Sequence, residues 1–347
     1  MKAILKDKQE PGLAYGEHPV RDLKPHEVLL QIHTATICGT DILIYHWHPL
    51  IRDFIKDPPF IPGHECGAVI AELGTEVRGF SVGDRVAVET HLPCGNCYQC
   101  RTGEQHICRD MVLFGHNFNG CFAEFAVVPQ QILFKIDDAL SLEKAALLEP
   151  MGVSFQGVEK AQVAGDSVAV IGAGPIGLFA IYLARKMGAT RVIAIDINKF
   201  RLDLALQLGA DTVFDPQQSN VPEEILALTD GDGVGRIIDA AGANESLSES
   251  FSYLRKGGRL ILVGNPKQDL VIKSPMVSLV QKEITIKGVH GRRMYDTWEK
   301  TQNFLLEKTL PLELFVSHEF AMTDYDKAFA EIDSGRTSKV MLRNKHE

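Results

Sequence analysis

The stretch SVAVIGAGPIGLFAIYLARKMGATRVIAID, residues 167–196, decides the fold of the middle of this chain. Ser167 to Ile171 has the apolar composition of a buried strand, and a helical pattern begins at Pro175 and ends at Gly188. Between them, three glycines form the pattern G-x-G-x-x-G: Gly172, Gly174 and Gly177. This order predicts a dinucleotide-binding βαβ unit, because the glycines let a pyrophosphate approach backbone amides at a helix N-terminus. A glycine turn without a nucleotide is the alternative.

The next predicted strand indicates which cofactor is bound. It runs from Arg191 to Ile195 and ends in Asp196, 19 residues after Gly177, where a carboxylate can accept the ribose hydroxyls. A 2'-phosphate would be repelled by that charge, so the sequence predicts NAD, while Lys199 and Arg201 nearby leave NADP open. Apolar stretches at residues 235–242, 257–266 and 283–289 predict further strands of a doubly wound parallel sheet.

Length and composition limit the class of protein. A chain of 347 residues exceeds one ordinary core and predicts two domains, or one inserted into another. The net charge of -9 argues against nucleic acid as a partner, because phosphate binding needs a basic face. No apolar run approaches the roughly 20 residues of a membrane span, and the N-terminus lacks a signal-peptide pattern. We therefore expect a cytoplasmic protein that binds neither nucleic acid nor membrane.

Four of the seven cysteines follow the pattern C-x2-C-x2-C-x7-C, namely Cys94, Cys97, Cys100 and Cys108. In a reducing cytoplasm such spacing favours metal ligands over disulfides. The short loops bring three thiolates to one centre and the longer loop returns the fourth, as in a sealed tetrahedral zinc site. A ferredoxin pattern has a shorter last spacing and then proline, whereas Arg109 follows here. The sequence predicts structural zinc, with an iron–sulfur cluster or bare thiols as alternatives.

A second metal centre is suggested by residues far apart in the sequence. Cys38 leaves a predicted strand at a glycine turn, and His64 and Glu65 follow a proline-rich turn. Glu149 lies in the apolar helical segment AALLEPMG, where an unpaired carboxylate would be costly to bury. Cys38 and His64 with Glu149 or Glu65 would give the S/N/O ligand set of a catalytic zinc with one open position. Such a zinc would polarise an alcohol oxygen and lower its pKa.

With these signals in place, the chain resembles the zinc-dependent medium-chain alcohol dehydrogenases over essentially its whole length, and most closely their L-threonine 3-dehydrogenase branch. The resemblance rests on the stretches ICGTDILIYHW, VETHLPCGNCYQCRTGEQHIC, GCFAEFAVVP, GAGPIGL and GRRMYDTWEK. The last of these is the more specific to the branch, whereas the zinc and glycine motifs belong to the superfamily.

The resemblance implies a GroES-like, mainly-β catalytic domain at residues 1–155 and 291–347, a Rossmann domain at residues 156–290, and an active site in the cleft. It implies metal ligation by Cys38, His64 and Glu65, with Glu149 as a nearby or exchanging fourth ligand. Thr40 matches the hydroxyl of the proton relay and His91 a histidine of the substrate pocket. The implied cofactor contacts beyond the glycine loop are Ile176, Asp196, Arg201, Leu262, Val263, Gly264, Val289 and His290. Two zinc ions per chain, NAD and a homotetramer are expected.

Three departures from the family pattern concern the substrate. The relay of the family has a histidine three residues after the threonine, where this chain has Leu43, and His46 or His48 is the candidate replacement. After Glu149-Pro150 the chain reads MGVSFQ where the branch has Gly-Asn-Ala-Val. The spacing between His64-Glu65 and the following glycine also differs from the family pattern, because Gly67 and Ala68 are exchanged in role.

The predicted reaction is hydride transfer from a secondary alcohol to NAD, with L-threonine oxidised to 2-amino-3-oxobutanoate. Thr40 would carry the hydroxyl proton toward solvent, and Arg292 or Arg293 is a candidate for binding the substrate carboxylate. A polyol or sugar-alcohol dehydrogenase, of the sorbitol or butanediol type, is the alternative within the superfamily. An NAD-binding regulatory protein without turnover is the alternative of another class.

Overall fold

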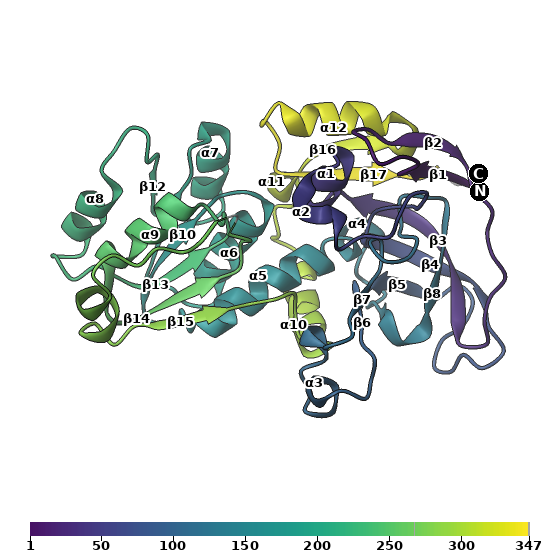
Figure 1. The fold of residues 1–347 in the computed structure, drawn as a ribbon, viewed down its shortest axis with the longest axis horizontal. Helices are drawn as coiled ribbons and strands as arrows, with labels where there is room; N and C mark the ends of the chain where they lie inside the picture. The colour runs from purple at the N-terminus through teal and green to yellow at the C-terminus, as the bar shows by residue number, and fades with distance from the viewer. Residues whose placement is uncertain (267, 346–347) are drawn as a thin grey trace. The chain divides into compact units, whose positions relative to one another are not determined.

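The computed structural model describes residues 1–266 and 268–345 and divides into two compact units (Figure 1). Unit 1 comprises Met1–Pro150, Arg293–Ser334 and Lys339–Glu347, and unit 2 comprises Met151–Arg292 and Gly335–Ser338. Unit 2 therefore interrupts unit 1 in the sequence. Residues from the two ends of the chain pack together within unit 1.

Unit 2 is built on a six-stranded sheet in which all neighbouring strands are parallel. In spatial order the strands are β12 (Thr212–Phe214), β11 (Arg191–Ile195), β10 (Ser167–Ile171), β13 (Val234–Asp239), β14 (Leu254–Leu262) and β15 (Thr285–Gly288). The helices of the unit are α6 (Pro175–Lys186), α7 (Lys199–Gln207), α8 (Val221–Leu228), α9 (Asn244–Tyr253), a π-helix at Met276–Val280 and most of α5 (Leu148–Ala161). Taken in chain order, the strands lie 3-2-1-4-5-6, which is the Rossmann arrangement. The predicted doubly wound parallel sheet is confirmed.

The glycine motif lies between β10 and α6 as predicted. α6 begins at Pro175, and Gly188 follows its end with a φ of 91° that favours glycine. Gly177 allows the helix to approach the turn, because a Cβ atom there would lie 1.8 Å from the carbonyl oxygen of Gly172. Both predicted strands, β10 and β11, have the predicted bounds.

Unit 1 contains a seven-stranded, mainly antiparallel sheet. Its strands run in the order β16 (Val316–Ala321), β17 (Lys339–Arg343), β3 (Glu27–Thr36), β4 (Glu65–Leu73), β5 (Arg85–Val88) and β9 (Leu133–Lys135), and β8 (Phe125–Pro129) also pairs with β3. Two small sheets pair β1 (Lys2–Leu5) with β2 (Ala14–Glu17) and β6 (His91–Leu92) with β7 (Val112–Leu113). The sheet of unit 1 joins the N-terminal strands to β16 and β17, which come last in the chain.

Unit 1 also contains short helices. They are α1 (Gly39–Tyr45), α2 (Pro49–Arg52), α3 (Tyr98–Arg101), α4 (Leu142–Ala145), α10 (Asp296–Leu305), α11 (Leu312–Phe315) and α12 (Tyr325–Asp333), with 3-10 turns at Gln105–Ile107, Gln130–Ile132 and Met322–Asp324. The apolar face of β3 forms the centre of the core, where Val28, Leu30 and Ile32 are fully buried. In the described parts of the chain no helix combines the length and hydrophobicity of a membrane span.

Candidate metal and cofactor sites

Three candidate metal ligands converge where β3 ends and β4 begins. Cys38 precedes α1, His64 directly precedes β4, and Glu65 is the first residue of that strand. One ligand atom of each residue lies within 4.8 Å of the other two. Adjacent strand residues point to opposite faces, but His64 lies outside the strand, after Gly63 with a φ of 90°. The chain bend therefore lets neighbouring residues reach one point.

Asp41 connects the two turns that carry Cys38 and His64. Its carboxylate accepts hydrogen bonds from the backbone amides of Cys38 at 2.8 Å and Gly63 at 3.3 Å. Asp41 Oδ1 also lies 3.8 Å from Nδ1 of His64. At that separation the carboxylate acts on the ring electrostatically, and Nδ1 of His64 makes no hydrogen bond within the described residues.

A buried lysine contacts the same centre. Lys339, the first residue of β17, places Nζ 2.7 Å from Oε1 of Glu65 and donates to the carbonyl oxygen of Ile37 at 3.1 Å. The two paired side chains are only 3% and 1% exposed. Burial opposes the charge of Lys339, but Glu65 and Cys38 outweigh it and raise the pKa of the lysine. The hydroxyl of Thr36 donates to the other oxygen of Glu65.

Glu149 and Thr40 border this centre without belonging to the compact group of three. Glu149 is buried in the first turn of α5, accepts a hydrogen bond from Thr90 Oγ1 at 2.8 Å, and acts electrostatically on His64 and Glu65. Thr40 lies in the first turn of α1. Its Oγ1 is buried and has no hydrogen-bond partner among residues 1–266 and 268–345. An unpartnered buried hydroxyl is costly, so this atom is placed to meet a ligand.

The charge around His64 matches what a divalent cation needs. Burial disfavours the imidazolium, but Asp41, Cys38 and Glu149 outweigh that effect and raise the pKa of His64 to about 10. With Glu65, four acidic groups thus surround one histidine, and Lys339 neutralises only one of them. A divalent cation would offset two of the remaining three and favour a neutral His64, and a set of one thiolate, one imidazole and carboxylates suits zinc. The residues therefore fit the metal.

A second histidine, His116, lies beside the first. The ring centroids of His64 and His116 are 4.7 Å apart, and Nδ1 of His116 lies 3.2 Å from the carbonyl oxygen of Phe114. Burial, aided by the charge of His64, lowers the pKa of His116 to about 3. This histidine is therefore neutral near pH 7 and adds a polar but uncharged wall to the site.

His91 is held by a buried carboxylate. Its Nδ1 lies 2.6 Å from Oε1 of Glu89, and the indole Nε1 of Trp298 donates to Oε2 of the same glutamate at 2.6 Å. His91 lies on β6 and Trp298 on α10, and all three side chains are buried. Because Nδ1 faces a carboxylate, the neutral ring carries its proton on Nδ1 and its lone pair on Nε2.

Of the two candidate replacements for the relay histidine, His48 directly precedes α2, where its Nδ1 accepts a hydrogen bond from the backbone amide of Leu50 at 3.2 Å. Leu43 packs with the buried cluster of Ile44, Ile51 and Phe60. His46 follows Thr40 by six residues, which at about 100° per residue places it on another face of the helix, where its Nε2 lies 3.1 Å from Oδ1 of Asp333.

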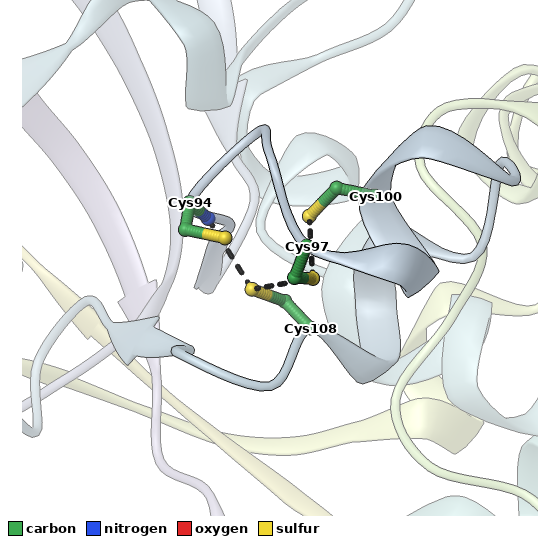
Figure 2. Close-up of side chains that lie close together, drawn as sticks. All are labelled: Cys94, Cys97, Cys100 and Cys108. Carbon is green, nitrogen blue, oxygen red and sulfur yellow. Dashed lines mark hydrogen bonds between the residues drawn. The ribbon is translucent and has the colours of Figure 1, made fainter.

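The four clustered cysteines converge as predicted for a metal site (Figure 2). The sulfur of Cys97 lies 3.4 Å from that of Cys100 and 3.8 Å from that of Cys108, and no disulfide links them. Tetrahedral zinc with Zn–S bonds of about 2.3 Å separates its sulfur ligands by about 3.8 Å, so the spacing fits zinc. Hydrogen bonds from the backbone at Cys100 and Arg109 lower the pKa of the Cys97 thiol to about 6, which favours the thiolate that binds metal.

A cavity of about 350 Å³ lies at the carboxyl ends of the parallel strands of unit 2. Four of the expected cofactor contacts line it: Gly172, Gly174, Asp196 and Arg201. Asp196 accepts backbone hydrogen bonds from Ala173 at 2.6 Å and Asn198 at 2.8 Å. Nε of Arg201 is buried and has no hydrogen-bond partner within the described ranges. The cavity thus offers a carboxylate and a guanidinium next to a glycine-lined helix N-terminus.

The other expected cofactor contacts lie near that edge but do not line the cavity. Ile176 and Gly177 belong to the first turn of α6, and the Ile176 carbonyl accepts a hydrogen bond from Ser154. Leu262 ends β14 and is followed by Val263 and Gly264, and Val289 and His290 follow β15, at the carboxyl ends of their strands. Because all strands are parallel, these loops come to one edge of the sheet.

Family models match both parts of the chain. The alcohol dehydrogenase GroES-like domain matches residues 24–138, and the zinc-binding dehydrogenase family matches residues 175–307. The chain belongs to the zinc-binding alcohol dehydrogenases. It is 37% identical to the L-threonine 3-dehydrogenase of Pyrococcus horikoshii over 99% of this chain and 98% of that protein.

Solved structures of zinc-binding dehydrogenases share the fold. The galactitol-1-phosphate dehydrogenase of Escherichia coli superimposes with a TM-score of 0.91 at 28% identity, over 99% of this chain and all of the other. A zinc-binding dehydrogenase of Sinorhizobium meliloti, solved with NADP bound, gives a TM-score of 0.90 at 25% identity, over 99% and 98% of the two chains. This chain is thus an NAD(P)-dependent alcohol dehydrogenase of the zinc-binding family.

Several residues of these sites in the dehydrogenase were not found from the sequence. Lys339, Thr36, Glu89, Trp298 and His116 carry no spacing motif. The pairing of β17 and β4 with β3 brings Lys339 and Thr36 to Glu65, whereas Glu89 and Trp298 contact His91, and His116 lies beside His64. Around the cofactor cavity, reasoning from the fingerprint missed the loop after β13, of which Ala240, Ala241 and Ala243 line the cavity. That loop had a usable signal, because Ala240 and Ala241 lie at the carboxyl end of the apolar stretch 235–242 that was itself predicted as a parallel strand.

Proposed function

We propose that this dehydrogenase oxidises the secondary hydroxyl of L-threonine to the ketone of 2-amino-3-oxobutanoate, with NAD as the hydride acceptor. One hydride leaves the substrate carbon for the nicotinamide, and the hydroxyl proton is released to solvent. The observation that carries the proposal is the compact group of Cys38, His64 and Glu65 with the unpartnered Thr40 hydroxyl on the next helix turn. The full-length similarity to an L-threonine 3-dehydrogenase supports this choice of substrate.

In this proposal a zinc ion held by Cys38, His64 and Glu65, with Glu149 as a further or exchanging ligand, supplies Lewis-acid polarisation of the substrate hydroxyl. Thr40 relays the hydroxyl proton, accepting it at Oγ1 while its own hydroxyl proton passes on toward solvent. His91, oriented by Glu89, lines the substrate pocket in this proposal. The Cys94, Cys97, Cys100 and Cys108 site holds a second zinc ion that fixes its loop.

NAD is the proposed cofactor because Asp196 lines the cavity beside the glycine loop. Its negative charge would repel a 2'-phosphate and accept ribose hydroxyls. Arg201 on the same wall can contact the adenosine end.

The domain boundaries at residues 155–156 and 290–291, a cytoplasmic location and a homotetramer stay predictions.

A sugar-alcohol substrate is the second candidate. Leu43 packs into an apolar cluster where the family relay has a histidine, so the proton path of this chain differs from the family pattern. The fold match to a galactitol-1-phosphate dehydrogenase supports this candidate.

The test compares initial rates of NADH formation by zinc-loaded protein with L-threonine, 2,3-butanediol, sorbitol and galactitol. We expect the highest kcat/KM with L-threonine and no turnover in Cys38→Ser. Zinc content is the control, because the Cys38→Ser variant should keep the ion at the four clustered cysteines if it folds. Activity on the polyols alone would show that the substrate is a polyol and not L-threonine. Full turnover of Cys38→Ser would overturn the metal assignment.

A further inference from the structure

Glu65 is held from two sides by protein donors. Lys339 Nζ lies 2.7 Å from its Oε1, and the Thr36 hydroxyl donates to its Oε2. Thr36 and Glu65 stand opposite each other in the pairing of β3 with β4. β17 pairs with β3 through Met341 and Thr36, and this register brings the start of β17 to Cys38. A candidate metal ligand is thus held in place by side chains from two other strands.

The lysine and a metal ion would need the same carboxylate. A carboxylate offers about four lone-pair positions, so two donors leave room for a metal bond. The charges conflict, however, since a bound divalent cation and the Lys339 ammonium would both be buried next to Glu65. Like charges repel strongly where water is excluded. A metal at this site is therefore bound more weakly than its ligands alone would allow.

We propose that Lys339 is a positioning residue that competes with the metal for Glu65. Lys339 thereby prevents Glu65 from binding the metal tightly, and one coordination position of the metal stays open to substrate. The proposal rests on the metal site of the proposed function but not on the choice of substrate. Replacing the ammonium by a neutral group removes the repulsion and leaves Glu65 without its counter-charge. Both changes strengthen the bond between Glu65 and the metal.

The experiment uses Lys339→Met and Lys339→Gln in the zinc-loaded full chain. The glutamine keeps N–H donors for the Ile37 carbonyl and Glu65 but has no charge. The labile zinc is the ion proposed at Cys38, His64 and Glu65. The readouts are the rate at which a chelating dye removes this zinc and the visible spectrum after its exchange for cobalt. We expect release to slow at least tenfold, the cobalt spectrum to change with added ligation, and kcat to fall. Tighter metal with lower turnover is a combination that a merely structural lysine would not produce.

The matched controls separate charge from general damage. Lys135→Met removes an ion pair of the same 2.7 Å length, with Asp84, on the same sheet, and should leave zinc release unchanged. In Glu65→Gln, adding Lys339→Met should slow zinc release less than it does in the wild type, because only the repulsion between ammonium and metal is then removed and no carboxylate is freed. Unchanged or faster zinc release in both neutral variants overturns the proposal. A wild-type chain that holds no labile zinc would instead overturn the metal part of the proposed function. Activity on another alcohol would change the substrate assignment but neither the metal assignment nor the role of Lys339.

Discussion

Trp298 donates its indole N–H to Oε2 of Glu89 at 2.6 Å, and Oε1 of the same carboxylate lies 2.6 Å from Nδ1 of His91. One buried carboxylate thereby connects α10 to the histidine that we propose lines the substrate pocket. The backbone amide of His91 donates to the same Oε1 at 2.9 Å. The ring of His91 is thus oriented by a glutamate that is itself held by a tryptophan 209 positions away from it in the sequence.

We expect Glu89→Gln to lower kcat/KM for the alcohol at least tenfold, with little change in the Kd of NADH. A glutamine has a single acceptor oxygen and cannot accept from both Trp298 and His91. The free energy of unfolding should also fall by roughly 1–3 kcal/mol, measured by urea denaturation. Glu104→Gln is the control, since Glu104 stands 3.6 Å from His106 but is 45% exposed. Wild-type kcat/KM in Glu89→Gln would contradict a positioning role for Glu89.

Thr40→Val should separate activity from stability. It removes the hydroxyl that we propose accepts the substrate proton, so kcat should fall about 10²-fold or more. Because Oγ1 of Thr40 has no hydrogen-bond partner in the described chain, unfolding free energy should stay equal or rise slightly.

Thr34→Val is the opposite case and serves as the control for Thr40→Val. Its hydroxyl donates to the carbonyl of Leu142 at 2.9 Å, so its loss should cost about 1 kcal/mol and leave kcat unchanged. An active Thr40→Val enzyme would remove Thr40 from the proton path.

Cofactor choice should depend on the charge of Asp196. Asp196→Asn is expected to raise the KM for NAD and to shift the ratio of kcat/KM for NADP over NAD at least tenfold toward NADP. Asp203→Asn, on the exposed face of α7 where it pairs with Lys199, is the control that should leave the ratio unchanged. An unchanged ratio in Asp196→Asn would mean that another wall of the cavity selects the cofactor.

The zinc at the clustered cysteines should act on stability alone. Cys97→Ala is expected to lower zinc content by one ion per chain and to open residues 94–108 to limited proteolysis, because the loop has few buried contacts besides the thiols. The labile zinc should remain. Full zinc content in this variant would show that the four sulfurs do not share an ion.

Acid should weaken unit 1 through Glu27. Hydrogen bonds from Arg21, at 2.6 and 2.7 Å, lower the pKa of this carboxyl below its ordinary 4.5. A lowered pKa means that the contribution to stability is present above pH 4.5 and disappears as the pH falls through the folded value. Glu27→Gln should therefore be less stable than wild type at pH 7, and the difference should vanish in acid. Urea denaturation over a pH series measures this, and a constant difference would contradict it.

A structural feature could be predicted from the sequence where the residues that form it lie close together in the chain. The bounds of β10 and β11 were predictable because a buried strand, a glycine turn and a helix are encoded by adjacent residues. The four clustered cysteines were predictable for the same reason. Glu65 was recognised as a ligand candidate, but its partner Lys339 lies 274 positions away and could be found only through the pairing of β17 with β3.

The shifted glycine after His64-Glu65 also has a structural reason that the sequence did not reveal. A Cβ atom on Gly67 would lie 2.1 Å from the carbonyl oxygen of Leu142, because α4 packs directly on β4. Only glycine fits between this helix and the strand. The departure from the family pattern therefore reflects packing in unit 1.

The position of β17 at the end of unit 1 has a consequence for synthesis on the ribosome. Cys38, His64 and Glu65 emerge early, unit 2 emerges next and can fold as a unit, and Lys339 emerges after both. Until then, the edge of β3 that β17 will cover is unpaired, and Glu65 lacks its ammonium partner. A nascent chain that captures zinc at this stage would hold it by an unopposed carboxylate, so the final strand both closes the sheet and loosens the metal.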